Sequence, residues 1–334
     1  MINDNKKELI SMIVPTGIGA SIGGFAGDAS YWARKFSEYF NVIVNPNVVN
    51  AACFSGIKEN MLYCEGSAFD RFMKGEISLK PSRHNKIGVI FDKGISEGIR
   101  NVHINTMNAV KTVYGTDIIG YEISEEEAGV EFFNTKERIS SGRVLNPQTL
   151  LKAGKKLLDR GAQALAVVCK FDEPPEDDYI NGNDVDIVGG VEAIISHYLT
   201  SELMTPVVHA PAFENIEITK DIVSEKVAAE YITPTFLPCL LLGLENAPLI
   251  FEGIREEYIH RHQLKGVIMP YNSLGASCVL DSITAKIPVF AVEENKTILN
   301  VTSEVINKKN DIIKVPTYRN CLELLLKDYI YEKV

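Results

Sequence analysis

Short apolar runs alternate with longer segments of helical periodicity along most of the chain. The apolar runs that we predict to be strands cover residues 9–14, 41–44, 86–91, 117–121, 164–168, 206–209, 266–269 and 288–292. The segments with helical periodicity cover residues 28–40, 97–114, 147–160, 190–203, 236–244, 276–285 and 319–331. This alternation predicts an α/β fold with mostly parallel or mixed sheets flanked by helices.

Three segments share one order of parts: a glycine turn, a helix, a short strand and an asparagine at the strand exit. They span residues 17–47, 188–215 and 273–295, and they end on Asn47, Asn215 and Asn295. Side chains beyond the carboxyl ends of parallel strands lie where α/β proteins bind ligands. We therefore expect these segments to line one crevice. Ordinary repetition of strand, turn and helix is the alternative, because the spacings differ.

The length and composition permit either two domains or one large unit. The chain has 334 residues, of which 46% are hydrophobic, and no linker-like change of composition divides it. Since a domain typically has roughly 100 to 200 residues, we predict two α/β halves with the ligand crevice between them. The N-terminal half, residues 1–145, contains the glycine-rich loop, and the C-terminal half is residues 146–334.

The charge and the cysteines restrict the expected partners and location. The chain carries 34 basic and 44 acidic residues, and its formal charge of −10 repels nucleic acid polymers and anionic membranes. Six cysteines without a CxxC pair are typical of a reducing compartment. No apolar stretch is long enough for a membrane span or an export signal. We expect a cytoplasmic protein with a small-molecule ligand, and these observations are also compatible with a homo-oligomer.

The glycine-rich segment VPTGIGASIGGFAGDA, residues 14–29, follows a predicted strand and precedes a helix. Glycines let a backbone approach a ligand closely, and free amides at a helix start can bind an oxyanion. The segment has neither a GxGxxG fingerprint nor the lysine of a P-loop. We predict that it binds an anionic substrate, with a structural turn as the alternative. Its candidate substrate-binding residues are Thr16, Gly17, Gly19, Ser21, Gly23, Gly24 and Asp28.

The segment GGVEAIISHYL, residues 189–199, carries a carboxylate, a hydroxyl and an imidazole on one predicted helix. Glu192 and Ser196 share a helix face, His197 follows them, and His209 stands at the exit of the next strand. Because these side chains can act as general acids and bases, we predict that all four are catalytic. Structural histidines or a metal site are the alternatives. No HExxH or paired-histidine spacing supports a metal, and no motif identifies a cofactor.

Further substrate-binding candidates stand near strand exits, mainly in the first and third of the repeated segments. They are Asn47, Asn50, Asn215, Ser277, Glu293, Asn295 and Thr297. The acidic segment of residues 172–178 lies in a loop that contains proline and glycine, and it is the best candidate for a lid over the site.

Eight stretches between residues 14 and 297 together carry a resemblance to a known family. They are VPTGIGASIGGFAGDA, NPNVVNAA, YCEGSAFDRF, GAQALAVVCKF, GGVEAIISHYL, PVVHAPAF, AEYITPTFLPCLLLGLENAP and AVEENKT. The family that they resemble is an uncharacterised one of cyanobacteria, other bacteria and plant plastids. It typically has histidine where Asn45 stands and a run like PASACGG where this chain has PYNSLGAS. The resemblance supports the location of the site and implies no particular reaction.

The run GGVEAIISH is also slightly similar to a GGTEGxxSPH run of the ring-opening cyclic amide hydrolases. That similarity would make Ser21, Ser196 and Ser277 corresponding hydroxyls of three repeated units. The paired lysines of those enzymes are not evident, since Lys170 alone lies near a predicted strand end.

These observations favour a metabolic enzyme that acts on a small polar metabolite, expected to be anionic, by acid–base chemistry of the hydrolase, lyase or isomerase type. A ligand-binding or regulatory protein without catalytic activity would use the same crevice. A nucleotide-binding transferase is a third hypothesis, because the segment SLGASCVLDSITAKIPVFAVEEN resembles, in pattern only, units that bind sugar nucleotides.

Overall fold

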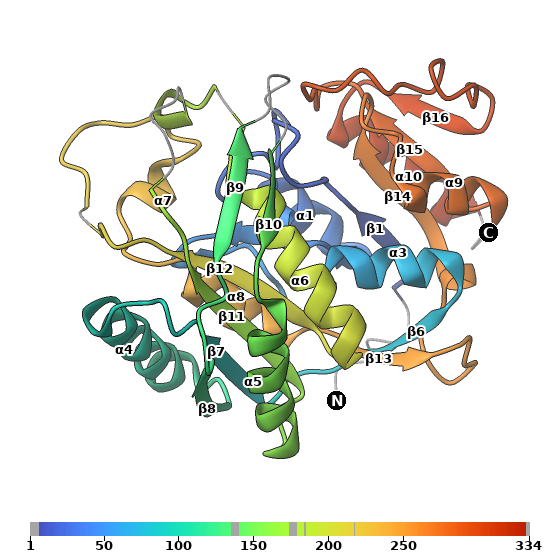
Figure 1. Cartoon of the computed structure of the whole chain (residues 1–334). Helices are drawn as coiled ribbons and strands as arrows, with labels where there is room; N and C mark the ends of the chain where they lie inside the picture. The colour runs from blue at the N-terminus through green and yellow to red at the C-terminus, as the bar shows by residue number, and fades with distance from the viewer. Residues whose placement is uncertain (1–6, 135–139, 174–178, 184, 217, 332–334) are drawn as a thin grey trace.

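The computed structural model describes residues 7–134, 140–173, 179–183, 185–216 and 218–331. Two parallel β-sheets with helices packed against them form the framework (Figure 1). The predicted α/β class with parallel sheets flanked by helices is therefore confirmed. Within the described residues, no helix combines the length and the apolar character that crossing a membrane requires.

The larger sheet has six strands in the order β16-β15-β14-β1-β2-β5. Its strands are β1 (Leu9–Met12), β2 (Asn41–Val44), β5 (Met61–Tyr63), β14 (Leu264–Pro270), β15 (Val289–Val292) and β16 (Ile312–Val315). All neighbouring pairs are parallel. Strands from the two ends of the chain meet in its middle, because β1 pairs with β14.

The smaller sheet has four parallel strands in the order β12-β11-β7-β8. They are β7 (Ile87–Phe91), β8 (Ile118–Ile123), β11 (Ala164–Lys170) and β12 (Val207–Ala212). The apolar run of β11 is buried from Ala164 to Cys169, as expected of a central strand covered on both faces.

The remaining strands form short antiparallel pairs. They are β3 (Asn50–Ala51) with β4 (Phe54–Ser55), β6 (Ile77–Lys80) with β13 (Leu249–Glu252), and β9 (Val130–Asn134) with β10 (Ser140–Val144). The last pair lies between the predicted strand 117–121 and the predicted helix 147–160.

The helices pack on both sheets and between them. They are α1 (Ser30–Ser37), α2 (Pro46–Val49), α3 (Gly66–Lys74), α4 (Glu97–Tyr114), α5 (Pro147–Asp159), α6 (Gly189–Leu203), α7 (Ala228–Tyr231), α8 (Leu237–Glu245), α9 (Ser277–Thr284) and α10 (Tyr318–Tyr331), with single 3₁₀ turns η2 (Tyr179–Asn181) and η3 (Arg261–Gln263). Helix α3 is not among the predicted helices, although Glu65 caps its start and Gly75 adopts a left-handed conformation at its end.

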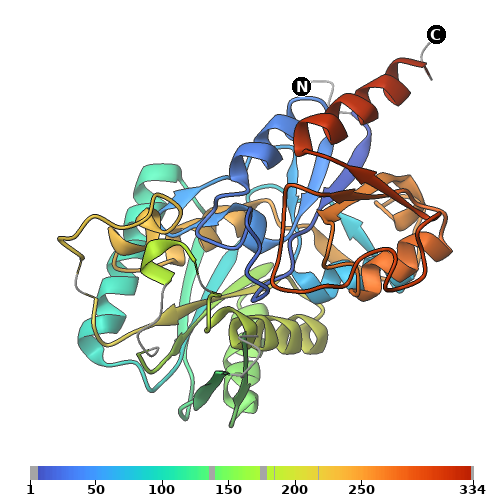
Figure 2. The ribbon, with the colours of Figure 1, turned by 90° about the horizontal axis from the view of Figure 1, so that it is seen from above.

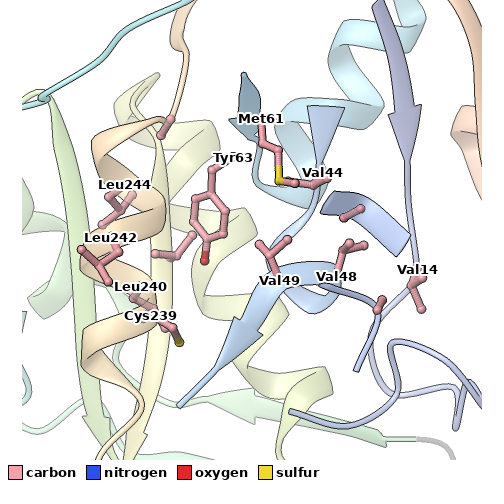
Figure 3. Packing of buried hydrophobic residues seen from close by; sticks show 14 of the residues in the cluster. Val14, Val44, Val48, Val49, Met61, Tyr63, Cys239, Leu240, Leu242 and Leu244 are labelled. Carbon is pink, nitrogen blue, oxygen red and sulfur yellow. The ribbon is translucent and has the colours of Figure 1, made fainter. Parts of the chain in front are cut away.

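One apolar core joins the two sheets. Helix α8 is apolar almost all round, and it lies beside Tyr63 in one cluster with Val48 and Val49, which follow β2 (Figure 3). A Cβ atom on Gly243 would lie 2.7 Å from the Tyr63 ring, so this contact requires glycine. An all-round apolar helix of this kind is typical of a buried position.

The sheets divide the chain differently from the two predicted halves. The six-stranded sheet takes its strands from residues 9–63 and 264–315, whereas the four-stranded sheet takes them from residues 87–123 and 164–212. A cut after residue 145 would separate β1 from β14 and β7 from β11, which are neighbours in the sheets. Figure 2 shows the blue N-terminal strands beside the orange and red C-terminal ones.

Candidate functional site

A cavity of about 400 Å³ is lined by segments from both sheets. Residues that follow β2 contribute from the six-stranded sheet, and β12 contributes from the four-stranded sheet. The N-terminal part of α6 forms another wall, and α6 itself packs between β12 and α3 (Figure 1). The cavity therefore occupies the kind of position, at strand ends and between packed units, where α/β proteins bind ligands.

Glu192 of α6 and His209 of β12 meet at the cavity wall. Glu192 Oε1 lies 3.4 Å from His209 Nδ1, and the side chains are 21% and 1% exposed. Neither ring nitrogen of His209 has a hydrogen-bond partner among the described residues. The ring packs against Phe171, with their centroids 5.3 Å apart. A polar group buried in this way is costly unless a ligand or a water molecule completes its hydrogen bonds.

Burial changes the charge states of both groups. It raises the pKa of Glu192 to about 8 and lowers the pKa of His209 to about 3, because each charged form loses its hydration. At neutral pH the pair therefore consists of a protonated carboxyl group and a neutral imidazole. Their separation slightly exceeds that of a good hydrogen bond.

His197 forms a second acid–base pair, with Glu65, at the cavity. His197 Nε2 donates to Glu65 Oε1 at 3.0 Å, and the imidazole is 46% exposed. Burial alone would lower the pKa of His197, but this hydrogen bond and the negative charges of Glu65 and Asp70 outweigh it and raise the pKa. Glu65 is also the cap of α3, where it accepts from the amides of Ser67 and Ala68. The cap fixes the carboxylate, and the carboxylate orients the imidazole.

A third cluster lies where the cavity meets η2 and α7. The Tyr179 hydroxyl donates to Glu230 Oε1 at 3.0 Å. Burial and the negative charges of Asp186, Glu192 and Asp28 raise the pKa of Glu230 to about 8, although the Tyr179 hydrogen bond opposes the shift. Tyr179, Asp186, Glu192 and Glu230 all line the cavity.

Two potential nucleophiles line the cavity without an activating base. Ser196 donates its hydroxyl to the backbone oxygen of Glu192 at 3.0 Å, one turn earlier in α6. The Cys239 thiol donates to the backbone oxygen of Phe236, and burial raises its pKa to about 12. The thiol thus stays protonated at neutral pH and is not a thiolate nucleophile.

The glycine-rich loop uses its own amides internally. The amides of Gly23 and Phe25 donate to Asp28 Oδ1 at 2.7 and 3.3 Å, so the protein's own carboxyl group occupies the expected anion position. Burial raises the pKa of Asp28 to about 6. The amide of Ile22 donates to Asn295 Oδ1 at 3.0 Å, and that of Ser21 to a backbone oxygen. This part of the loop is thus held by the chain itself.

The predicted site residues fall into two groups. Those that line the cavity are Thr16, Gly24, Asn47, Asn50, Glu192, Ser196, His197, His209 and Asn215. Those outside its lining are Gly17, Gly19, Ser21, Gly23, Asp28, Ser277, Glu293, Asn295 and Thr297. The first and second repeated segments therefore reach the cavity through their asparagines, whereas the asparagine of the third does not.

The third repeated segment has other contacts. Asn295 binds Ile22 of the glycine loop and the hydroxyl of Tyr318. Ser277 hydrogen-bonds Asp70 of α3, and Glu293 is exposed. Thr297 accepts from the amide of Leu299, two residues further along. Of the three serines suggested by the cyclic amide hydrolases, only Ser196 lines the cavity.

Several residues of the cavity lining are not among the predicted site residues. The only local signal for Glu65 and Asp186 is a carboxylate close to the start of a helix, α3 or α6, where negative charge is favoured. Tyr179 and Glu230 lie in segments without clear periodicity, where no local signal marks them. The described residues contain no cluster of three side chains suited to a metal ion. Residues 174–178 of the predicted lid lie outside the described residues.

Comparison with known proteins gives a family for this architecture. Residues 10–328 match the family described as "Protein of unknown function (DUF3326)". Over 297 residues the chain is 35% identical to an uncharacterized lipoprotein of Synechococcus sp. (strain ATCC 27144 / PCC 6301 / SAUG 1402/1), covering 87% of this chain and 82% of that protein. No solved structure matches the chain. Since the family match includes every segment that lines the cavity, and the predicted resemblance to an uncharacterised cyanobacterial family is confirmed, the chain belongs to the DUF3326 family.

Proposed function

We propose that the protein is an enzyme that acts on a small polar metabolite by acid–base chemistry, with Glu192 and His209 as the proton-transfer pair. The observation that supports this most directly is the 3.4 Å approach of Glu192 Oε1 to His209 Nδ1 at the wall of the cavity. Carboxyl and imidazole groups whose environments shift their pKa values in a cleft are characteristic of catalytic sites.

The charge states give each group a role. With a pKa of about 8, Glu192 holds a proton at neutral pH that it can donate to a substrate. The neutral imidazole of His209 has a nitrogen lone pair that can accept a proton once Glu192 has given up its own, because the carboxylate formed 3.4 Å away stabilises the imidazolium. His197, whose pKa is raised, supplies a second proton donor at the more exposed side of the cavity.

The surroundings restrict the type of reaction. Cys239 remains a thiol, and Ser196 bonds to its own helix, so neither provides an activated nucleophile. We therefore favour proton-transfer reactions, such as isomerisation or elimination, or hydrolysis by a water molecule that His209 activates. This retains the acid–base part of the sequence-based hypothesis.

The anionic part of that hypothesis has less support. No lysine or arginine stands among the described residues that line the cavity. The glycine-loop amides of Gly23 and Phe25 already bind Asp28. The proposal therefore specifies a polar metabolite and assigns no anion site to the loop.

The proposal is tested by finding the ligand and then removing the proton-transfer groups. Native mass spectrometry of the purified protein identifies co-purifying metabolites, and their turnover is followed with the unmodified chain. We expect His209→Asn and Glu192→Gln each to lower kcat by about 10² to 10⁴, the usual contribution of a general acid or base. His262→Asn, at an exposed position, is the matched control and should retain full turnover.

Unchanged turnover in both variants would contradict the proposal. Tight binding without turnover, insensitive to either histidine of the cavity, would identify a ligand-binding or regulatory protein instead. A nucleotide as the co-purified ligand would favour the transferase hypothesis.

We also propose a cytoplasmic location. All six cysteines are free, and five of them are buried, as in proteins of reducing compartments. The relative from Synechococcus is named a lipoprotein, and a lipid-anchored location is the alternative that this name raises. Cell fractionation of the native protein separates the two, since recovery with the membranes would contradict a cytoplasmic location.

A further inference from the structure

The lining of the cavity has a clear excess of acidic groups. Among the described residues, five carboxyl groups line it and only two basic side chains do. The carboxyl groups belong to Glu65, Glu173, Asp186, Glu192 and Glu230, and the basic groups are His197 and His209. His197 pairs with Glu65 and His209 faces Glu192, so both basic side chains of the lining stand beside these two carboxyl groups.

Glu230 is the member of this group with the most restrictive surroundings. It receives the Tyr179 hydroxyl at 3.0 Å, and the charges of Asp186, Glu192 and Asp28 all disfavour its ionisation. Repulsion of this kind is relieved when a positive charge binds among the carboxyl groups. The nearby ammonium group of Lys226 lies 5.0 Å from the centroid of Phe25, and Lys226 does not line the cavity.

Aromatic rings form part of the same wall. Phe25 and Tyr179 are packed with their centroids 5.3 Å apart, and Phe213 and Tyr231 also line the cavity. Aromatic faces attract organic cations, and they offer apolar area for an alkyl chain. Carboxyl groups combined with aromatic rings suit an amine better than a hydrated inorganic anion.

The deep end of the cavity independently indicates a ligand. His209 is 1% exposed and lines the cavity, yet both its ring nitrogens lack a hydrogen-bond partner in the described part of the chain. An imidazole buried in this way needs a group from a ligand or a water molecule.

We propose that Glu230, Asp186 and Tyr179 bind a positively charged amino group of the ligand, while Glu192 and His209 face the part of the ligand that reacts. The substrate class is thus a small polar amine. The amine site itself does not depend on the proposed function. Only the statement that one ligand contacts both the amine site and the Glu192–His209 pair rests on it.

The first test uses three probes of equal chain length with the full-length protein: n-butylamine, n-butanol and butyrate. Binding is measured by ligand-observed NMR titration. We expect the amine to bind at least about tenfold more tightly than the alcohol, as one well-placed charge interaction allows. Butyrate should bind more weakly than either. Tighter binding of butyrate than of butylamine would overturn the proposal.

The pH dependence tests the role of Glu230 in the unmodified protein. Because Glu230 must lose its proton to pair with the amine, the Kd for butylamine should rise about tenfold for each unit by which the pH is lowered below the pKa of the carboxyl group. The groups that set this titration are Asp186, Glu192, Asp28 and the Tyr179 hydroxyl. The Kd for n-butanol should not change in this way. A Kd for butylamine independent of pH between about pH 6 and pH 8 would contradict the assignment.

Substitution provides the third test. Glu230→Gln keeps a hydrogen-bond acceptor for Tyr179 and removes the charge, so we expect the preference for butylamine and its pH dependence to disappear. Glu225→Gln, at an exposed position five residues earlier, is the matched control. Unchanged amine binding in Glu230→Gln would overturn the proposal. If that variant does not fold, the pH dependence of the Kd for butylamine in the unmodified protein tests the role of Glu230 instead. Displacement of butylamine by equimolar Mg²⁺ would identify a metal site and also overturn it.

The two proposals fail in different ways. If butylamine binds as expected but His209→Asn retains turnover of the identified metabolite, the amine site stands and the acid–base assignment fails. If the identified metabolite has no amino group and its turnover still depends on His209, the acid–base assignment stands and the amine site fails.

Discussion

At the scale of single residues, burial sets the chemistry of the cavity. Glu192 and His209 are ordinary ionisable side chains in the sequence. In water at neutral pH, a glutamate is negatively charged and a histidine is mostly neutral. In the folded protein the pKa of Glu192 is about 8, so its carboxyl group keeps its proton at neutral pH. The reason is desolvation, because neither group has the basic or acidic partner that would fully offset its burial.

This burial predicts a dependence of stability on pH that Glu192→Gln should remove. The unfolded carboxyl has a pKa near 4.5 and the folded one about 8, so both states are protonated in acid. As the pH rises from about 4.5 to 8, the unfolded state loses its proton first and the folded state becomes less stable. The cost is about 1.4 kcal/mol for each unit of difference.

We therefore expect Glu192→Gln to be more thermostable than the unmodified chain near pH 8, with a smaller difference near pH 5. Differential scanning calorimetry at a series of pH values measures this. Glu202→Gln, an exposed position on the same helix, should show a difference that does not grow with pH. A constant difference for Glu192→Gln would mean that the folded carboxyl titrates normally.

At the scale of elements, two asparagines hold the segments around the glycine loop. Asn45 accepts from the amide of Val14 at 3.1 Å and donates to its oxygen at 2.8 Å. Asn295 does the same with Ile22, at 3.0 and 2.7 Å. A carboxamide has a donor and an acceptor side by side, so it can satisfy both polar groups of one residue where no strand does so. Buried asparagines at strand exits here position the loop that lines the cavity.

We expect Asn295→Ala to destabilise the protein by about 2 to 4 kcal/mol. The substitution removes the hydrogen bonds to Ile22 and Tyr318 and leaves buried polar groups without partners, at about 1 to 3 kcal/mol each. Urea unfolding measures the change, with Asn300→Ala at an exposed position as the control. Equal stability of the two variants would show that the loop does not depend on Asn295.

At the scale of the whole molecule, the two sheets are interleaved along the chain. The middle of the chain forms the four-stranded sheet, and both ends form the six-stranded one. Helix α8 and Tyr63 then link the sheets through a common apolar core (Figure 3). The cavity lies between parts that neither end of the chain could form alone.

The fragment 1–145 should therefore not fold cooperatively by itself. It would expose the edge of β1 that pairs with β14 and the edge of β7 that pairs with β11, together with their apolar faces. Circular dichroism and thermal unfolding of the purified fragment, beside the full-length chain, test this. A cooperative unfolding transition in the fragment would contradict it.

The sequence by itself determined the elements whose signal is local. The predicted bounds of β2 and α4 coincide with those of the structure, because a continuous apolar run and a capped periodic segment depend on near neighbours. It also placed Glu192, His197 and His209 at a common site, since strand exits and helix starts meet in α/β folds. Only the tertiary structure decided that Glu65, Asp186 and Glu230 join them, and that Asp28 and Asn295 occupy the amides of the glycine loop. Those contacts join segments far apart in the chain or depend on the shape of a loop. The charge states of Glu192 and His209 then follow from their burial, and no local sequence pattern predicts how deeply a side chain is buried.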